Sequence, residues 1–414
     1  MDRAVYIASA VRTPIGKFGG GLADLSAPDL GVIAVRAALE RAFGTAPAAR
    51  TPGDRAPAAP TSLPCRVDEL IFGNARSAGT GPNPARQIAW RAGLGDDVPA
   101  FTVNMACASS LRAILLGWQQ IALGSADIIV AGGAESMSRV PYLLDARWGM
   151  RMGHQPLVDA MYRDGFLCPL SQMIMGETAE LLAREYHISR DQQDEFAQES
   201  HARAARAMQS CRFSQEIISV EKTDAKGRAS RIEKDEHVRP EVTRESLAKL
   251  PPVFAKDGAI TAGNSSGITD AASAVVLVSK EKLKALGVAP LARIVDATVA
   301  AVEPHRMGIG PVPACRKLEE RTGWKIADYH AIELNEAFAA QVLACDRELH
   351  FDRARLNPNG GAIALGHPIG ATGARIVTTL VHELRRENHS GMRRGLATLC
   401  VSGGLGVALA LEVT

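Results

Sequence analysis

The chain has 414 residues, of which 46% are hydrophobic and 22% charged, and its formal net charge is +2. This composition predicts a globular protein with a large core, and the weak net charge gives no reason to expect nucleic acid or a membrane as a partner. Seven cysteines without a Cys-x-x-Cys pair indicate free thiols in the cytoplasm, and the ten histidines lack the spacing of a zinc site, so no metal is expected.

Apolar strand patterns alternate with helical patterns, which predicts an α/β fold with a largely buried sheet. The first strand begins at Val5, so we expect no signal peptide before it. Residues 44–64 are rich in alanine and proline without an apolar period, which predicts a surface insertion away from the chemistry. Further strands are expected in "VDELIFGNA", "FTVNMA", "DIIVAGGA", "AIELNEAF" and "LATLCVSGG", and a helix in "SLRAILLGWQQIA".

The middle of the chain departs from this alternation. It contains charged and methionine-rich stretches with few strands, and Ser189 followed by Gln192 predicts the capped start of a helix. We therefore predict three units: a first α/β half over residues 1–136 that is completed by residues 257–280, an inserted and mainly helical loop domain over 137–256, and a second α/β half over 281–414.

Two pairs of features recur about 260 residues apart. Asn74 and Asn335 each end a predicted strand, and Cys107 and His367 each lie in a turn before a predicted helix. Chance similarity among glycine-rich turns is one explanation. The nearly equal intervals favour duplication of one α/β unit.

Cys107, in "NMACASSLRAI", lies between a predicted strand and the N-terminus of a predicted helix. Free N–H groups and the helix dipole favour a thiolate at such a place, and a thiolate is a good nucleophile that forms thioesters. The alternative is a small buried core cysteine, which is the commoner fate of this residue type.

Three further residues lie in turns that suit chemistry. His367 lies in the glycine-rich "NPNGGAIALGHPIGATGAR", where close backbone approach to a ligand makes it a candidate base. Asn335, in "ELNEAFAAQ", can hold a water, polarise a carbonyl or cap the following helix. Cys400, in "LATLCVSGGLG", reads alone as a core residue, although the turn from Ser402 onward could offer backbone N–H groups to an oxyanion.

Taken together, these turns resemble the thiolase family of acyl-CoA acyltransferases along almost the whole chain. The resemblance rests on six motifs in order: "NMACASS", "GGAESMS", "TAGNSSGITDAASAVVL", "NEAF", "GGAIALGHPIGATGAR" and "CVSGGLGVA". It implies a duplicated thiolase fold of five layers, αβαβα, with the loop domain over the active site.

The resemblance also implies catalytic roles. Cys107 would be the acylated nucleophile and His367 its activating base, while Asn335 would position a water in an oxyanion hole that His367 completes. Cys400 would be the acid/base at the acyl α-carbon. The backbone N–H groups of Cys107 and Ser402 would form a second oxyanion hole, although the family often has glycine at the position of Ser402.

Coenzyme A would be held by the loop domain and a neighbouring serine. Leu247 and Phe254 would suit an ordinary core equally well. The positions implied by the motifs are Arg239, Ser246, Leu247, Phe254, Ala262, Ser266 and Phe338.

The expected function is reversible Claisen condensation and thiolysis through an acyl-cysteine, as an acetyl-CoA acetyltransferase. Ile174 departs from the histidine common in acetoacetyl-specific members, so a degradative 3-ketoacyl-CoA thiolase of broader chain length is the alternative. A ketosynthase-like enzyme would not need Cys400, and a non-catalytic CoA-ester-binding relative would lack Cys107 or His367. The resemblance implies a cytoplasmic homodimer or homotetramer that binds acyl-CoA and CoA as substrates and keeps no permanent cofactor.

Overall fold

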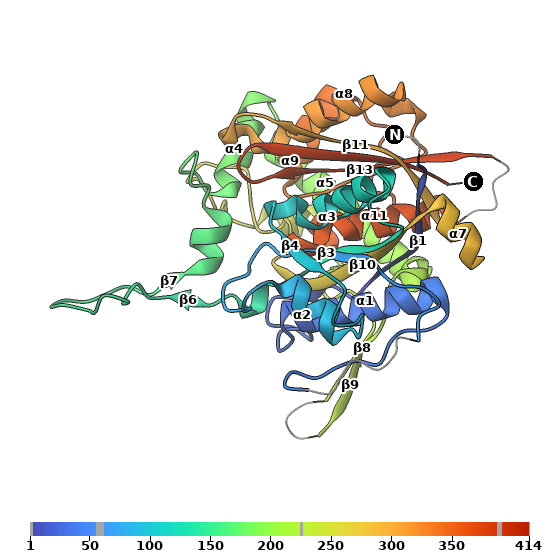
Figure 1. The fold of residues 1–414 in the computed structure, drawn as a ribbon. Coiled ribbons are helices and arrows are strands. Elements are labelled where there is room, and N and C mark those ends of the chain that lie inside the picture. The colour runs from blue at the N-terminus through green and yellow to red at the C-terminus, as the bar shows by residue number, and fades with distance from the viewer. Residues whose placement is uncertain (1–2, 55–61, 224–226, 387–390, 414) are drawn as a thin grey trace.

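The computed structural model describes residues 3–54, 62–223, 227–386 and 391–413. Its main sheet consists of two half-sheets of the same design (Figure 1). The first half-sheet runs in the order β4 (Ala100–Val103), β3 (Glu69–Gly73), β5 (Ile128–Ser136), β10 (Thr269–Ser279) and β1 (Val5–Arg12), with β2 (Gly16–Lys17) beside β10. The second runs in the order β12 (Ala331–Leu334), β13 (Arg393–Val401), β14 (Leu405–Val413) and β11 (Ala292–Ala301).

The pairing repeats between the halves. Strand β3 pairs in parallel with β4 and β5, and β12 pairs in parallel with β13. A single parallel bridge between Ile332 and Leu356 stands where the first half has β4. The halves join edge to edge through β1 and β11, where Val5 faces Ile294 and Ile7 faces Ala292. The predicted duplication is therefore confirmed.

Helices form three layers around the two half-sheets (Figure 1). The two central helices lie between the half-sheets, and two helices cover the outer face of each. The central pair is α3 (Ser109–Ala122) and α11 (Ile369–Arg385); the outer helices are α1 (Ala27–Phe43) and α2 (Pro84–Arg91) on the first half, and α8 (Pro311–Thr322) and α9 (Ala339–Leu349) on the second. The five-layered αβαβα arrangement is as predicted.

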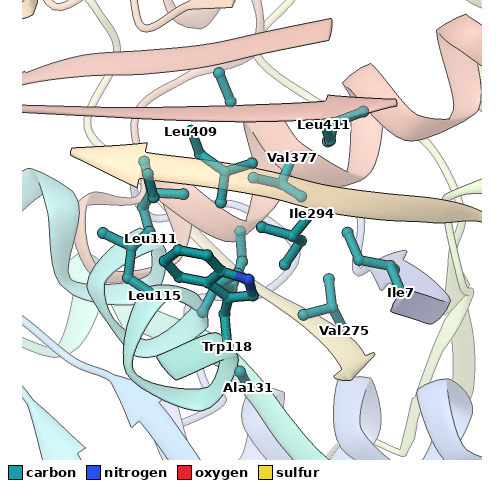
Figure 2. Packing of buried hydrophobic residues seen from close by; sticks show 14 of the residues in the cluster. Ile7, Leu111, Leu115, Trp118, Ala131, Val275, Ile294, Val377, Leu409 and Leu411 are labelled. Carbon is teal, nitrogen blue, oxygen red and sulfur yellow. The ribbon is translucent and has the colours of Figure 1, made fainter. Parts of the chain in front are cut away.

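The central layer contains the core that both halves share. Trp118 and Leu111 of α3 pack with Val377 of α11, and the two half-sheets contribute Val275 and Leu409 (Figure 2). These side chains are at most 6% exposed, so truncating one to alanine is expected to cost about 2–5 kcal/mol. This shared core holds the N-termini of α3 and α11 in fixed positions.

The segment between β5 and β10 is mainly helical. Its α5 begins after Ser189, whose side chain accepts the Gln192 N–H while the Gln192 side chain accepts the Ser189 N–H, so the predicted cap is confirmed. Its elements are β6 (Tyr142–Leu143), β7 (Val158–Asp159), α4 (Met175–Glu185), α5 (Arg190–Gln209), β8 (Val220–Thr223), β9 (Ala229–Ile232) and α6 (Arg244–Ala248). The short helices α7 (Lys280–Leu286) and α10 (Ala362–Leu365) lie in the two halves.

The predicted insertion 44–64 lies in part at 55–61, outside the described residues. Its described parts form no strand, and Arg50 stacks 3.9 Å from the centre of the Trp90 ring on α2. The described insertion therefore packs on the outer layer of the first half. No helix in the described ranges is long and apolar enough to cross a membrane.

Candidate active site

A cavity of about 830 Å³ opens between the two halves and the loop segment. Cys107, His367, Cys400 and Ser402 all line it, although they come from three distant parts of the chain. Parallel strands present their carboxyl ends at one edge, which is where α/β proteins place their ligands. The structure thus brings together the two thiols and the imidazole that the sequence singled out.

Cys107 lies in a 3₁₀ turn, Ala106–Ala108, just before α3. Ala106 has a φ of +44°, a strained value for a residue with a side chain. The turn is held because Ser109 Oγ accepts the Met105 N–H at 2.9 Å and donates to the Ala106 carbonyl at 2.7 Å. Local hydrogen bonds therefore offset the strain and fix the position of the thiol.

Burial raises the pKa of the Cys107 thiol above its usual range, although the nearby Arg76 guanidinium lowers it. The backbone N–H groups of Ser402 and of Cys107 face the sulfur and lower its pKa as well. Because burial outweighs these effects, Cys107 rests as a thiol. The expectation that free N–H groups and the helix dipole favour a thiolate holds only in part: backbone N–H groups do lower the pKa of Cys107, but not enough to offset burial.

The hydrogen bonds of His367 determine its tautomer. Thr372 Oγ1 donates its single hydrogen to the Pro368 carbonyl at 3.0 Å, so it must accept from His367 Nδ1, which lies 2.7 Å away. Nδ1 therefore carries the proton, and Nε2 presents a lone pair. Nε2 is buried and has no hydrogen-bond partner among the described residues.

Burial lowers the pKa of His367 to about 3, and the positive charges of Arg375 and Arg76 lower it as well. The imidazole is thus neutral at physiological pH and can accept a proton at Nε2. A neutral base and a neutral thiol in one cavity avoid burying a permanent ion pair, which would carry a large desolvation cost.

Cys400 is the last residue but one of strand β13 and is fully buried beside Met307 and Phe338. Burial raises the pKa of its thiol well above the usual range, and the proximity of Cys107 raises it further. Cys400 therefore rests as a thiol and can donate a proton into the cavity.

The turn after Cys400 places a backbone donor at the cavity. Ser402 has a negative φ, so serine fits where the family often has glycine, while Gly403 and Gly404 have φ values of +90° and +83°. A Cβ on Gly404 would overlap the Val302 carbonyl oxygen. Glycine at 404 is thus required by both conformation and space.

Asn335 is fully buried, and neither polar atom of its side chain has a hydrogen-bond partner among the described residues. An unpartnered buried amide costs about 1–3 kcal/mol, so it is expected to bind a water or a substrate oxygen. Asn335 does not cap α9, whose N-cap is Phe338, so the capping alternative is wrong. Asn335 is not among the side chains that line the cavity.

The expected CoA-binding residues divide into two groups. Ser246 is exposed and bonds within its own helix turn, and Leu247 packs into the core, so neither lines the cavity. Five do line it: Arg239, Phe254, Ala262, Ser266 and Phe338.

Sequence reasoning missed several lining or supporting residues. Arg76 lies beside Cys107, and its backbone N–H donates to the buried Glu135 carboxylate at 3.0 Å. Glu135 also accepts the Gly370 N–H at 2.7 Å, so it ties the first half to the start of α11. The sequence feature that could have indicated Glu135 is a charged residue within the apolar stretch "IIVAGGAES". His237 also lines the cavity and was missed, whereas Ile174, which lines it too, is singled out by the sequence.

All seven cysteines lie in the described part of the chain and are free thiols. In the same ranges, no group of three His, Cys, Asp or Glu side chains is placed to hold a metal ion. The chemistry of the cavity therefore has to be derived from thiol, imidazole, amide and backbone groups.

Comparisons with known proteins identify the family. Sequence models of the thiolase N-terminal and C-terminal domains match residues 57–281 and 288–413. Acetyl-CoA acetyltransferases of Pseudomonas aeruginosa and Cupriavidus necator are 47% and 46% identical; the first alignment covers 98% of both chains and the second 99% of both.

Solved structures give the same result. The acetyl-CoA acetyltransferase of Bacillus anthracis has a TM-score of 0.91 at 42% identity, and human mitochondrial 3-ketoacyl-CoA thiolase has 0.90 at 39%. Each match covers 100% of this chain and 99% of the other. With the fold, the two domain matches and full-length relatives in agreement, the chain belongs to the thiolase family and is a thiolase.

Proposed function

We propose that this thiolase transfers acyl groups between CoA thioesters through an acyl-Cys107 intermediate, and that it acts as an acetyl-CoA acetyltransferase. The observation that carries the proposal is the neutral thiol of Cys107 in one cavity with the free Nε2 of His367 and a second buried thiol, Cys400. The names of the full-length relatives support acetyl-CoA as the substrate.

In the cleavage direction, Cys107 loses its proton to His367 Nε2 as its sulfur attacks the keto carbon of a 3-ketoacyl-CoA. The carbon–carbon bond then breaks, and its electron pair passes to the acetyl-CoA enolate. Cys400 donates its proton to the enolate carbon. Acyl-Cys107, imidazolium and the Cys400 thiolate remain.

In the second half-reaction, a CoA thiol gives its proton to the Cys400 thiolate and attacks acyl-Cys107. The Cys107 thiolate leaves and recovers its proton from His367, so all three residues return to their resting states. Condensation of two acetyl-CoA molecules is the exact reverse of these steps. Because Cys400 rests protonated, it must first lose a proton before it can act as the base in that direction.

Two sets of donors suit the two developing oxyanions. The N–H groups of Ser402 and Cys107 face the nucleophile, so they are suited to the thioester oxygen. Asn335, with its unpartnered amide, is suited to bind a water that supports the enolate oxygen together with His367. Loss of one such donor typically lowers the rate about 10²–10³-fold.

The test is the mass of the protein's peptides after incubation with acetyl-CoA. An acetyl group is expected on Cys107 and absent from the Cys107→Ser variant. The exposed Cys211 is the control, because it is a free thiol that lies outside the cavity lined by His367. Acetylation of Cys211 instead of Cys107 would refute the intermediate.

A broader 3-ketoacyl-CoA thiolase is the second candidate, and Ile174 favours it. Ile174 lines the cavity near Tyr162 and Phe166, so this wall is apolar and can contact a longer acyl chain. Comparing thiolysis of four-carbon and longer ketoacyl-CoA substrates separates the two. A preference for the longer substrates would replace the acetyl-CoA assignment.

CoA is proposed as a substrate, with no permanently bound cofactor. Arg239 lies at the cavity where a CoA phosphate could pair with it, and Phe254 packs edge-on against Phe338, which gives the tunnel an apolar wall. The other CoA contacts that the thiolase resemblance implies are also proposed. So is the division of the chain into two halves with a loop domain over 137–256.

A cytoplasmic homo-oligomer, dimeric or tetrameric, is also proposed. The turn between β6 and β7 projects from the body (Figure 1) and exposes Trp148, Met150 and Met152. Large apolar side chains gathered on a projecting turn are typical of protein contacts. A second copy of the chain is the partner that would cover them.

A further inference from the structure

His237 lies at the cavity, in a segment that the catalytic scheme does not use. Its ring is half-buried and stacks on His201, with ring centres 6.4 Å apart. Two residues later in the chain, Arg239 lines the same cavity. The ring therefore lies between the proposed CoA contact and the loop that carries His367.

One ring nitrogen of His237 holds the helix that precedes His367. Nδ1 lies 3.0 Å from the carbonyl oxygen of Ala364 in α10. A carbonyl can only accept, so Nδ1 carries the hydrogen. Burial lowers the pKa of His237, so the ring is neutral and Nε2 carries no proton.

The opposite edge of the ring lies against Gly267. A Cβ on Gly267 would overlap Nε2 and the two carbons beside it, so the imidazole touches that backbone directly. The Gly267 carbonyl in turn accepts the backbone N–H of His367 at 2.9 Å. His237 thus contacts both backbone segments, Ala364 and Gly267, that hold the His367 loop.

The segment that carries His237 is itself fixed. Asp235 accepts two hydrogen bonds from the buried Arg12 guanidinium, at 2.7 and 2.9 Å, and one from the Ile15 N–H at 2.8 Å. On the other side, the Arg239 N–H donates to His201 Nδ1 at 3.2 Å. The ring therefore braces the loop from a rigid support.

We propose that His237 is a positioning residue for the thiolase reaction: by bracing Ala364 and Gly267 it sets the distance between His367 Nε2 and the Cys107 sulfur. The proposal rests on the proposed roles of Cys107 and His367. It assigns His237 an effect on proton transfer, and no contact with the reacting atoms.

The test uses the full-length enzyme with two variants of His237 and one matched control. His237→Leu removes the Nδ1 donor, and His237→Asn keeps a donor at that position. His382→Leu is the control: His382 is also half-buried and also bonds a backbone carbonyl, that of Ala10 at 2.9 Å, but near the far end of α11. Thermal unfolding of each variant measures the structural cost.

His237→Leu is expected to lower kcat about 10–10²-fold with KM for acetyl-CoA nearly unchanged, because a misplacement of about 1 Å can cost 10²-fold. His237→Asn should recover most of kcat, and His382→Leu should keep it. Iodoacetamide labelling of Cys107 is measured on the peptide that contains it, between pH 6 and 9. The pH at which labelling rises should increase only in His237→Leu, because His367 is then displaced from the thiol.

Two results would overturn the proposal. The first is an unchanged kcat and an unchanged labelling profile in His237→Leu. The second is that His237→Leu and His382→Leu lose the same amount of kcat and the same amount of unfolding temperature. Failure of wild-type Cys107 to acetylate would refute the proposed function instead. That measurement is made on the unmodified enzyme, so the two failures are distinguishable.

Discussion

At the scale of single residues, the two cavity cysteines differ in what surrounds them. Cys107 is partly exposed to the cavity and faces the backbone donors of Ser402 and of its own N–H, whereas Cys400 is fully buried among apolar side chains. Burial raises both pKa values, but Arg76 and the N–H groups of Ser402 and Cys107 lower the pKa of Cys107, whereas only its own backbone N–H lowers that of Cys400. Their different surroundings therefore suit Cys107 to carry the acyl group and Cys400 to transfer a proton.

The variant Cys400→Ala tests this division. It should still become acetylated on Cys107, because the nucleophile and its base are kept and the departing CoA thiolate can take its proton from water in place of Cys400. Carbon–carbon bond formation and cleavage should fall about 10²–10⁴-fold, the usual contribution of a general acid or base. Peptide mass and an acetoacetyl-CoA thiolysis assay measure the two steps separately. Normal condensation in this variant would remove Cys400 from the mechanism.

Buried His201 predicts a pH dependence of stability. Burial lowers its pKa to about 4, and His237 when it is protonated and the charge of Arg239 lower it too, so the unfolded chain binds the proton more tightly. Stability from this group is therefore present above about pH 6.5 and is lost as pH falls toward 4.

Between pH 4 and 6.5, the unfolding free energy of the wild type should fall as the pH is lowered, by up to about 1.4 kcal/mol per pH unit from this one proton. The His201→Asn variant should lack this part of the slope. Denaturant unfolding of both proteins at several pH values measures it. Parallel curves for the two proteins would contradict the buried neutral state of His201.

At the scale of elements, the turn between β13 and β14 offers a matched pair of glycines. Both Gly403 and Gly404 have positive φ, so alanine at either costs about 1–2 kcal/mol. A Cβ at 403 meets only Leu170 Cδ1 at 4.0 Å, whereas one at 404 overlaps the Val302 carbonyl. Only the second change should displace the Ser402 N–H.

Gly403→Ala is therefore expected to lower the unfolding temperature and keep kcat, and Gly404→Ala to lower both, with kcat reduced about 10²-fold by loss of one oxyanion donor. Thermal unfolding and steady-state kinetics measure these effects. Equal kcat in the two variants would mean that the Ser402 N–H does not serve the reaction.

The strands and their catalytic turns could be predicted because each is a local pattern: an apolar run that ends close to Cys107, Asn335 or Cys400. The brace formed by His237 could not, because Ala364 and Gly267 are distant in sequence. The protonation states of the cavity thiols and imidazole could not be predicted either, since they depend on burial in the folded protein.

At the scale of the whole molecule, the projecting β6–β7 turn predicts the assembly state. The triple variant of Trp148, Met150 and Met152 to serine should form a smaller oligomer, because the apolar contact is lost. Leu123→Ser, at an exposed site at the end of α3, is the control and should leave the oligomer unchanged. Light scattering after size exclusion measures both, and an unchanged mass for the triple variant would place the contact elsewhere.

The narrow seam between β1 and β11 has a consequence for engineering. Along the chain, β10 and β11 are connected through helix α7. Three residue pairs join the half-sheets, and helices α3 and α11 pack together between them. A chain cut within α7 would carry Cys107 on one fragment and both His367 and Cys400 on the other. Neither fragment could turn over substrate alone, so thiolase activity would report their reassembly, and the enzyme could serve as a split reporter.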